Sequence, residues 1–196
     1  MINAAIQRER SVLVLVDYQQ RLMPAIHQAP ALLIEAQCLA DVAALLSVPV
    51  VGTEQNPKGL GPNVEALRQR CIATLDKMHF DACADGLLEL LRDRHPLGLP
   101  EIVLAGCEAH VCLMQTGLGL LRAGHPVWVV APACGSRSAT DHALAMQRLQ
   151  AAGALIVSTE MVIFEWLRGC EHAQFKPVLQ RLKQRDVERA AQAAPR

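Results

Sequence analysis

Two cysteines lie in the stretch AGCEAHVCLMQT, where an apolar run gives way to a helical pattern. A helix from about residue 110 to 122 would place Cys112 in its first turn, where free N–H groups and the helix dipole favour an anion. This position favours the thiolate, which is the nucleophilic form of cysteine. Cys107 precedes the helix and lacks this help. The spacing therefore indicates Cys112 as a candidate nucleophile, with two small buried hydrophobic residues as the alternative.

The apolar positions of the same helix predict which of its sides is buried. The expected core stripe follows helical spacing and consists of Val111, Met114, Leu118 and Leu121. Cys112 would lie off this stripe, on a face shared with Gln115, Gly119 and Arg122. We therefore expect Cys112 to escape the deep burial that raises the pKa of a core thiol.

Two charged residues at other strand ends have the chemistry to act with this thiol. Asp17 ends the apolar run SVLVLVD, where a carboxylate is costly unless it is used or paired. Lys77 follows the run CIATLD. A proton-accepting carboxylate, a cation and a thiol would together make a hydrolytic site. The alternatives are a structural hydrogen bond or helix cap for Asp17 and a solvated loop lysine for Lys77.

The elements that would position these residues alternate between short apolar strands and longer helices. Most of the expected strands are continuously apolar, as in parallel strands buried on both faces; they span 11–17, 49–54, 71–76, 101–106, 126–131 and 154–159. Helical patterns cover 31–47, 85–94, 110–122, 138–152 and 175–189. This order predicts a three-layer α/β fold on a doubly wound, mostly parallel sheet of about six strands. Ligands of such sheets bind beyond the carboxyl ends of the strands, where Asp17, Lys77 and Cys112 all fall.

Length and composition narrow the class of protein. The 196 residues fit one domain, and no linker divides 1–196. Nineteen basic and nineteen acidic side chains give zero formal net charge, which argues against nucleic-acid binding. No apolar run approaches the ~18–20 residues of a membrane span, and the segment MINAAIQRER has no secretory apolar region, so we expect a cytoplasmic protein. An odd number of cysteines, seven, without C-x-x-C, indicates reduced thiols rather than disulfides or a zinc site.

Several of these stretches resemble one family over nearly the whole chain. The motifs are LVDYQQ with Asp17, DKMHFDAC with Lys77, and GCEAHVC with Cys112, followed by GHPVWVVAPACGSRSATDHALAMQRLQAAGALIVSTE. Together they resemble the isochorismatase-like cysteine hydrolases. The stretches TEQNPKGLGPNVEAL and HAQFKPVLQRLK are similar to the isochorismatase-domain-containing branch, whose substrates are largely undefined.

The resemblance implies a catalytic triad of Asp17, Lys77 and Cys112. Asp17 would take the thiol proton and pass it to the leaving group, while Lys77 would orient the carboxylate and help to keep the thiol ionised. Cys112 would attack a carbonyl carbon and form an acyl-enzyme that water resolves. The resemblance also implies a cis peptide between Cys107 and Glu108, which would aim the Glu108 N–H beside the Cys112 N–H as an oxyanion hole.

Departures from the family pattern narrow the chemistry further. Nicotinamidases of this family carry a metal site of an Asp and several His just after the second strand, but no His occurs here between His27 and His79. We therefore expect no metal and no cofactor. True isochorismatases cleave a vinyl ether and need no thiol, so the thiol favours a small amide, thioester or related acyl substrate. Candidate pocket residues near the motifs are Tyr18, Gln19, Gln55 and Phe80.

Other readings of the thiol remain open at this point. One alternative is a redox-responsive thiol protein in which Cys112 is oxidised rather than acylated. Another is an interaction protein that keeps the fold without turnover. Members of the family are usually oligomers and the mean hydropathy of +0.20 is high, so we expect a homo-oligomer, dimeric or larger. We also expect Cys112 to be the most reactive thiol, because the helix dipole and Lys77 would outweigh Asp17.

Overall fold

The computed structural model describes residues 5–94 and 98–193 and contains one sheet of six parallel strands. The strands are β1 (Ser11–Val16), β2 (Val50–Gln55), β3 (Ala73–Lys77), β4 (Glu101–Gly106), β5 (Val127–Val130) and β6 (Leu155–Val157). Their order across the sheet is β3-β2-β1-β4-β5-β6. The chain therefore adds β2 and β3 on one side of β1 and then returns to add β4, β5 and β6 on the other side. The switch point of the doubly wound sheet therefore lies between β1 and β4.

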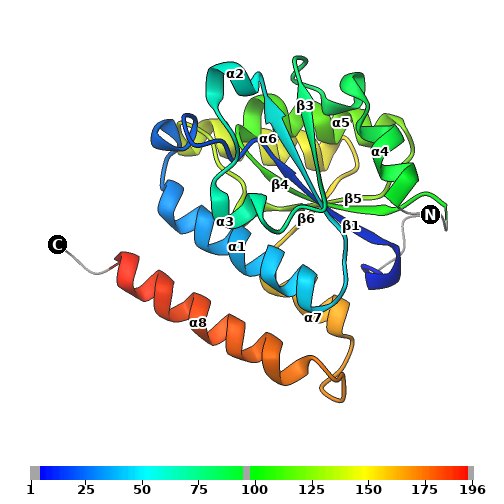
Figure 1. Ribbon diagram of the computed structural model, residues 1–196, viewed down its shortest axis with the longest axis vertical. Helices are drawn as coiled ribbons and strands as arrows, with labels where there is room; N and C mark the ends of the chain where they lie inside the picture. Colours follow the sequence, from blue (N-terminus) through cyan, green and yellow to red (C-terminus); the bar gives the residue numbers. More distant parts are fainter. Residues whose placement is uncertain (1–4, 95–97, 194–196) are drawn as a thin grey trace.

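Helices cover both faces of this sheet (Figure 1). One face carries α1 (Ala29–Leu45) and α7 (Thr159–Leu167), and α8 (Phe175–Ala193) packs along the outer side of α1. The other face carries α4 (Leu87–Arg94), α5 (Met114–Arg122) and α6 (Ala139–Ala151). The short helical turns are η1 (Arg8–Arg10), η2 (Met23–Ala25), α2 (Pro57–Leu60), α3 (Glu65–Arg68), η3 (Ala82–Asp85), the π turn η4 (Ala109–Leu113) and η5 (Ala131–Ala133). None of the helices within 5–94 and 98–193 is both long and apolar enough to cross a membrane.

The two covered faces explain why the central strand β1 is almost entirely apolar. Along β1, Leu13 and Leu15 belong to the core on the α1 side, whereas Val12 and Val14 belong to the core on the α5 side. A strand that buries both of its faces needs apolar residues at every position rather than at alternate ones. The predicted α/β fold with a parallel six-stranded sheet is therefore confirmed.

The helix after β4 differs from its prediction in its start and in its buried side. A π turn, η4, precedes α5, and the most buried residues of the two elements include Leu113, Thr116, Gly117 and Leu120. The expected stripe was wrong, because its members Val111, Met114, Leu118 and Leu121 are only half-buried. Gly117 shows the reason: a Cβ added there would lie 2.8 Å from Leu149 Cδ2, so α5 approaches its neighbours through small residues.

Helix α7 was absent from the prediction, which extended the last strand to residue 159. In the structure β6 ends at Val157 and Ser158 caps the helix, since its hydroxyl accepts a hydrogen bond from the Met161 N–H at 3.2 Å. The third strand is also shifted, so that Lys77 is its last residue rather than the first residue beyond it. That shift places Lys77 beside Gln55 in the register of β2 and β3.

Candidate active site

Asp17 stands at the carboxyl end of β1, where the chain turns with a positive φ of 52°. Its side chain is fully buried and makes contacts on both oxygens. Thr53 Oγ1 donates to Oδ1 at 2.6 Å, and Lys77 Nζ lies 2.7 Å from Oδ2. Both partners come from the two strands that follow on this side of the sheet, β2 and β3. The carboxylate is therefore held in one orientation within a dry site.

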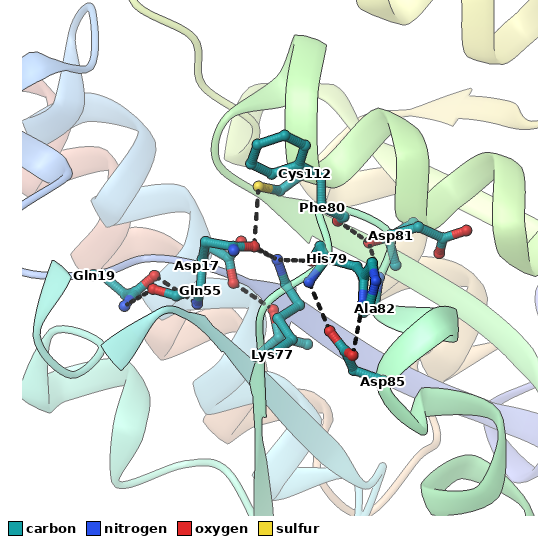
Figure 2. Close-up of polar contacts among 12 residues, drawn as sticks. Asp17, Gln19, Gln55, Lys77, His79, Phe80, Asp81, Ala82, Asp85 and Cys112 are labelled. Atoms are coloured by element: carbon teal, nitrogen blue, oxygen red, sulfur yellow. Dashed lines mark hydrogen bonds and ion pairs between the residues drawn. The ribbon is translucent and has the colours of Figure 1, made fainter. Parts of the chain in front are cut away.

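Lys77 shares its charge among three acceptors. Besides Asp17, its Nζ donates to Gln55 Oε1 at 2.6 Å and to the His79 carbonyl oxygen at 3.4 Å (Figure 2). Three acceptors match the three N–H bonds of an ammonium group. Because the Lys77 and Asp17 side chains both have zero exposure, removing either partner would leave the other charge buried without compensation.

Cys112 lies in the π turn beyond β4, close to this ion pair. Its sulfur is 3.9 Å from Gln55 Oε1, the same oxygen that accepts from Lys77, and the residue is only 6% exposed. Burial and then the nearby Asp17 carboxylate raise the pKa of the Cys112 thiol to about 12, and Lys77 opposes them only in part. The thiol is therefore protonated in the free protein, with a carboxylate beside it.

This result overturns the expectation of a stable thiolate at Cys112. The sequence indicates a helix start, but it does not show that the sulfur is buried or that Lys77 is already neutralised by Asp17. Of the seven free cysteines, the exposed one is Cys170. Simple alkylation of the resting protein should therefore reach Cys170 before Cys112, contrary to the predicted order.

The turn that carries Cys112 is held against the end of β1. Gly106 makes this possible, because a Cβ there would lie 2.3 Å from the Val16 carbonyl oxygen. The next peptide bond, between Cys107 and Glu108, is cis. Ala109 N donates to Gly135 O at 2.6 Å, which ties the turn to the loop after β5. The backbone thus brings the Cys112 loop and Asp17 together at the switch point of the sheet.

Two predicted pocket residues are part of the scaffold instead. Tyr18 is fully buried and its hydroxyl donates to the Ala133 carbonyl oxygen. Gln19 is also fully buried; its Nε2 donates to the carbonyl oxygens of Gln55 (3.0 Å) and Gly61 (2.6 Å), and its Oε1 accepts from the Gln55 N–H at 2.8 Å. Because these polar groups are engaged within the protein, neither side chain faces a substrate.

The other two pocket candidates lie closer to the thiol. Gln55 directs Oε1 toward Lys77 and Cys112, while its Nε2 donates to the Met78 carbonyl oxygen at 2.8 Å. Phe80 is 51% exposed, and its carbonyl oxygen accepts from Thr116 Oγ1, one helical turn beyond Cys112, at 3.3 Å. Gln55 is therefore a polar neighbour of the thiol, and Phe80 is an exposed apolar one.

Thr53 is the site residue that the sequence analysis did not identify. It lies in β2 opposite Val16 of β1, so its hydroxyl reaches the carboxylate that follows Val16. The available signal was the polar TEQ at the end of an otherwise apolar strand. Only the pairing of β2 with β1 shows that the threonine of this triplet donates a hydrogen bond to Asp17.

A cavity of about 430 Å³ lies away from the triad, between α1 and α6, and its lining includes His27, Glu35, Ser136, His142 and Arg189. Neither Asp17, Lys77 nor Cys112 lines it. We place the candidate active site at the triad because three chemically complementary side chains converge there, which volume alone does not provide. In the described part of the chain, no group of three or more His, Cys, Asp and Glu side chains is arranged to hold a metal ion.

Comparisons with known proteins identify the family and the fold of the chain. The isochorismatase domain matches residues 11–161. Isochorismatase domain-containing protein 2A of Mus musculus is 36% identical over 176 residues, which cover 90% of this chain and 84% of the relative. The solved structure titled MAR1 ribonuclease, from Caenorhabditis elegans, is 33% identical with a TM-score of 0.84 and coverages of 92% and 93%. The Escherichia coli ycaC gene product, titled an octameric hydrolase of unknown specificity, shares the fold at 18% identity, with a TM-score of 0.83 and coverages of 98% and 94%.

The matched segment contains Asp17, Lys77 and Cys112, the three side chains that meet at the switch point. Its extent and the identity to the mouse relative over most of both chains show common descent rather than a shared fold alone. Membership supports a hydrolase-type function. The chain belongs to the isochorismatase family.

Proposed function

We propose that this protein is a metal-independent cysteine hydrolase that cleaves small amides or related acyl compounds through Cys112, Asp17 and Lys77. The observation that carries the proposal is the convergence of a buried Asp17–Lys77 ion pair, 2.7 Å between Oδ2 and Nζ, on a nearby thiol. A buried charge pair beside a nucleophile is costly to maintain for structure alone. Perturbed titratable groups at the ends of parallel strands are typical of catalytic sites.

The proposed reaction begins with the neutral thiol. As the Cys112 sulfur bonds to the substrate carbonyl carbon, its proton passes to Asp17 and the carbonyl π electrons move to oxygen. The N–H groups of Glu108 and Cys112 are the proposed donors to that oxyanion. Other N–H groups of the turn are already engaged, since those of Val111 and Leu113 both donate to the Glu108 carbonyl oxygen, at 3.0 and 3.2 Å.

Collapse of the tetrahedral intermediate completes acylation. The bond from carbon to the leaving group breaks, and Asp17 returns its proton to the departing nitrogen, sulfur or oxygen. Water then attacks the carbonyl carbon of the thioester while Asp17 accepts its proton. The carbon–sulfur bond breaks, Asp17 returns the proton to the Cys112 sulfur, and the carboxylic acid leaves. Lys77 stays charged throughout and fixes the carboxylate that moves the protons.

The site also favours some substrates over others. Asp17, Lys77 and Gln19 are fully buried, so the substrate would reach the sulfur from the side of Gln55 and Phe80. A compact substrate with an apolar portion beside Phe80 and a polar group near Gln55 Oε1 fits this rim. We therefore propose Gln55 and Phe80, and not Tyr18 or Gln19, as the substrate-contact residues.

The wider expectations are proposed on the same basis. We expect one hydrolase domain over 1–196, a cytoplasmic location and a homo-oligomer, in line with the octamer named for the Escherichia coli structure. The Caenorhabditis elegans structure is named a ribonuclease, so RNA is a second substrate class to test. We expect no RNA cleavage here, because zero formal net charge provides no electrostatic footprint for a polyanion.

The test is a panel of small amides, thioesters and hydroxamate-type acyl compounds, with a short RNA added. Turnover of an acyl compound should disappear in Cys112→Ala, and rapid quenching should trap an acyl mass shift on the Cys112 peptide. Oxidation of Cys112 by peroxide without any acyl adduct would support the redox-responsive alternative. Absence of both turnover and adduct across the panel would support the interaction protein.

A further inference from the structure

A second carboxylate, Asp85, organises the backbone that follows Lys77. Asp85 ends η3, and its Oδ2 accepts hydrogen bonds from the N–H groups of Met78 and His79, both at 2.8 Å. Its Oδ1 is 2.8 Å from His79 Nδ1. Figure 2 shows Asp85 on the side of this segment away from Cys112. One side chain thus binds two consecutive peptide groups just beyond β3.

The carbonyl oxygens of the same two residues hold the catalytic groups. The Met78 oxygen accepts from Gln55 Nε2 at 2.8 Å, and the His79 oxygen accepts from Lys77 Nζ at 3.4 Å. The 78–79 segment is therefore bonded to Asp85 through its N–H groups and to the site through its carbonyl groups. No atom of Asp85 is bonded to Asp17 or Cys112 among the described contacts.

The orientation of the Gln55 amide depends on this arrangement. With Nε2 committed to the Met78 oxygen, Oε1 must face Lys77 Nζ, which it meets at 2.6 Å. A flipped amide would present its NH2 group to the ammonium and would lose both hydrogen bonds. Catalytic groups hold their geometry only when a supporting shell fixes them in this way.

We propose that Asp85 is a positioning residue of the active site, acting through residues 78–79 to fix the Gln55 amide and the Lys77 ammonium beside Cys112. The predicted effect of Asp85 on turnover rests on the proposed function, whereas its predicted effect on the pKa of the Cys112 thiol does not. Hydrogen bonds from the His79 side chain, and then from the two backbone N–H groups, lower the pKa of Asp85, so it accepts as a carboxylate at neutral pH. Its side chain is 20% exposed, so substitution there does not open the core.

Two substitutions separate positioning from simple stability. Asp85→Ala removes every acceptor, whereas Asp85→Asn keeps an oxygen for the Met78 and His79 N–H groups. Asp93→Asn makes the same charge change at an exposed position on α4 and is the matched control. Each is made in a Cys170→Ser background, because Cys170 is exposed and would compete for alkylating reagent.

The first readout is the pH profile of Cys112 alkylation by iodoacetamide, followed by peptide mapping, which needs no substrate. Lys77 lowers the pKa of Cys112, so a misplaced ammonium should move the Asp85→Ala profile to higher pH and slow alkylation several-fold at pH 9. The second readout is turnover of whichever acyl compound proves active. There kcat should fall by roughly 10- to 100-fold with little change in KM, because misplacement of ~1 Å has effects of that size.

Asp85→Asn should restore most of the Cys112 alkylation rate and most of kcat, and Asp93→Asn should match the parent protein in both. If Asp85→Ala fails to fold, Asp85→Ser takes its place, because a serine side chain is too short to accept from both the Met78 and His79 N–H groups as the carboxylate does. An unchanged alkylation profile in folded Asp85→Ala, or in the Asp85→Ser variant that replaces it, would overturn the proposal, even if an acyl substrate is found. A shifted profile without any substrate would support it while leaving the hydrolase proposal to its own test.

Discussion

Replacing Asp17 by asparagine should make Cys112 more reactive toward simple electrophiles while abolishing hydrolysis. In the folded protein the thiol pKa is about 12, so only about one molecule in 10⁴ carries a thiolate at pH 8. Asp17 is the second-largest cause of that shift, after burial, and Lys77 acts against both. The substitution removes the opposing charge and leaves Lys77 without its anionic partner.

The size of the effect follows from the proximity of these charges. A neighbouring charge within ~4–6 Å shifts a pKa by about 1–3 units, so the thiolate fraction at pH 8 should rise by roughly 10- to 1,000-fold. Burial remains, so the sulfur should still ionise above the ordinary value of a free cysteine. Turnover should nevertheless fall by orders of magnitude, because no group then takes and returns the thiol proton.

The assay is the iodoacetamide rate at Cys112 between pH 6 and pH 10, measured by peptide mapping in a Cys170→Ser background. The parent rate should climb steadily through this range, because its thiol is still mostly protonated at pH 10. Asp76→Asn is the matched control, since Asp76 is an exposed acidic residue directly before Lys77. Equal alkylation of Asp17→Asn and parent, together with full turnover in Asp17→Asn, would show that the carboxylate is structural and would refute the reasoning.

Four further outcomes are expected. Cys112→Ala should retain the circular dichroism spectrum of the parent and lose all hydrolysis, so any residual turnover would move the nucleophile elsewhere. Lys77→Met should lower the free energy of unfolding by about 3–5 kcal/mol in urea titrations, because it leaves a buried carboxylate unpaired; a change below 1 kcal/mol would mean that water reaches the site. Activity should survive dialysis against EDTA, and loss with recovery on adding a divalent ion would reverse the metal-independent assignment. Sedimentation should show species heavier than the 21.3 kDa chain, and a single monomer peak would contradict the expected homo-oligomer.

The sheet was predictable because its signal is local. A parallel strand that is buried on both faces must be apolar at every position, and most of the six predicted runs are of this kind. All six runs correspond to strands of the sheet. Helix α7 was missed although its buried residues Thr159, Val162, Ile163, Trp166 and Leu167 recur at helical spacing. The predicted strand was extended over Ser158 and Thr159, and this concealed the residue that caps the helix.

The site was less predictable because it depends on contacts between distant segments. The sequence placed Asp17, Lys77 and Cys112 at strand ends, but the burial that raises the thiol pKa comes from packing around the π turn. Likewise, nothing local shows whether a glutamine faces a ligand or the backbone. Gln19 is engaged by Gly61 and Gln55, which lie roughly 40 residues away along the chain.

Charge conservation explains why the proposed chemistry suits so dry a site. In the resting protein one buried cation, Lys77, balances one buried anion, Asp17, and the thiol is neutral. Proton transfer moves the negative charge from the carboxylate to sulfur, and attack on the carbonyl moves it on to the substrate oxygen, while the total stays at zero. A step that created net charge in this environment would cost several kcal/mol in lost hydration. Because each proposed step only relocates one charge around a fixed ammonium, the burial that keeps Cys112 protonated at rest does not oppose its reaction.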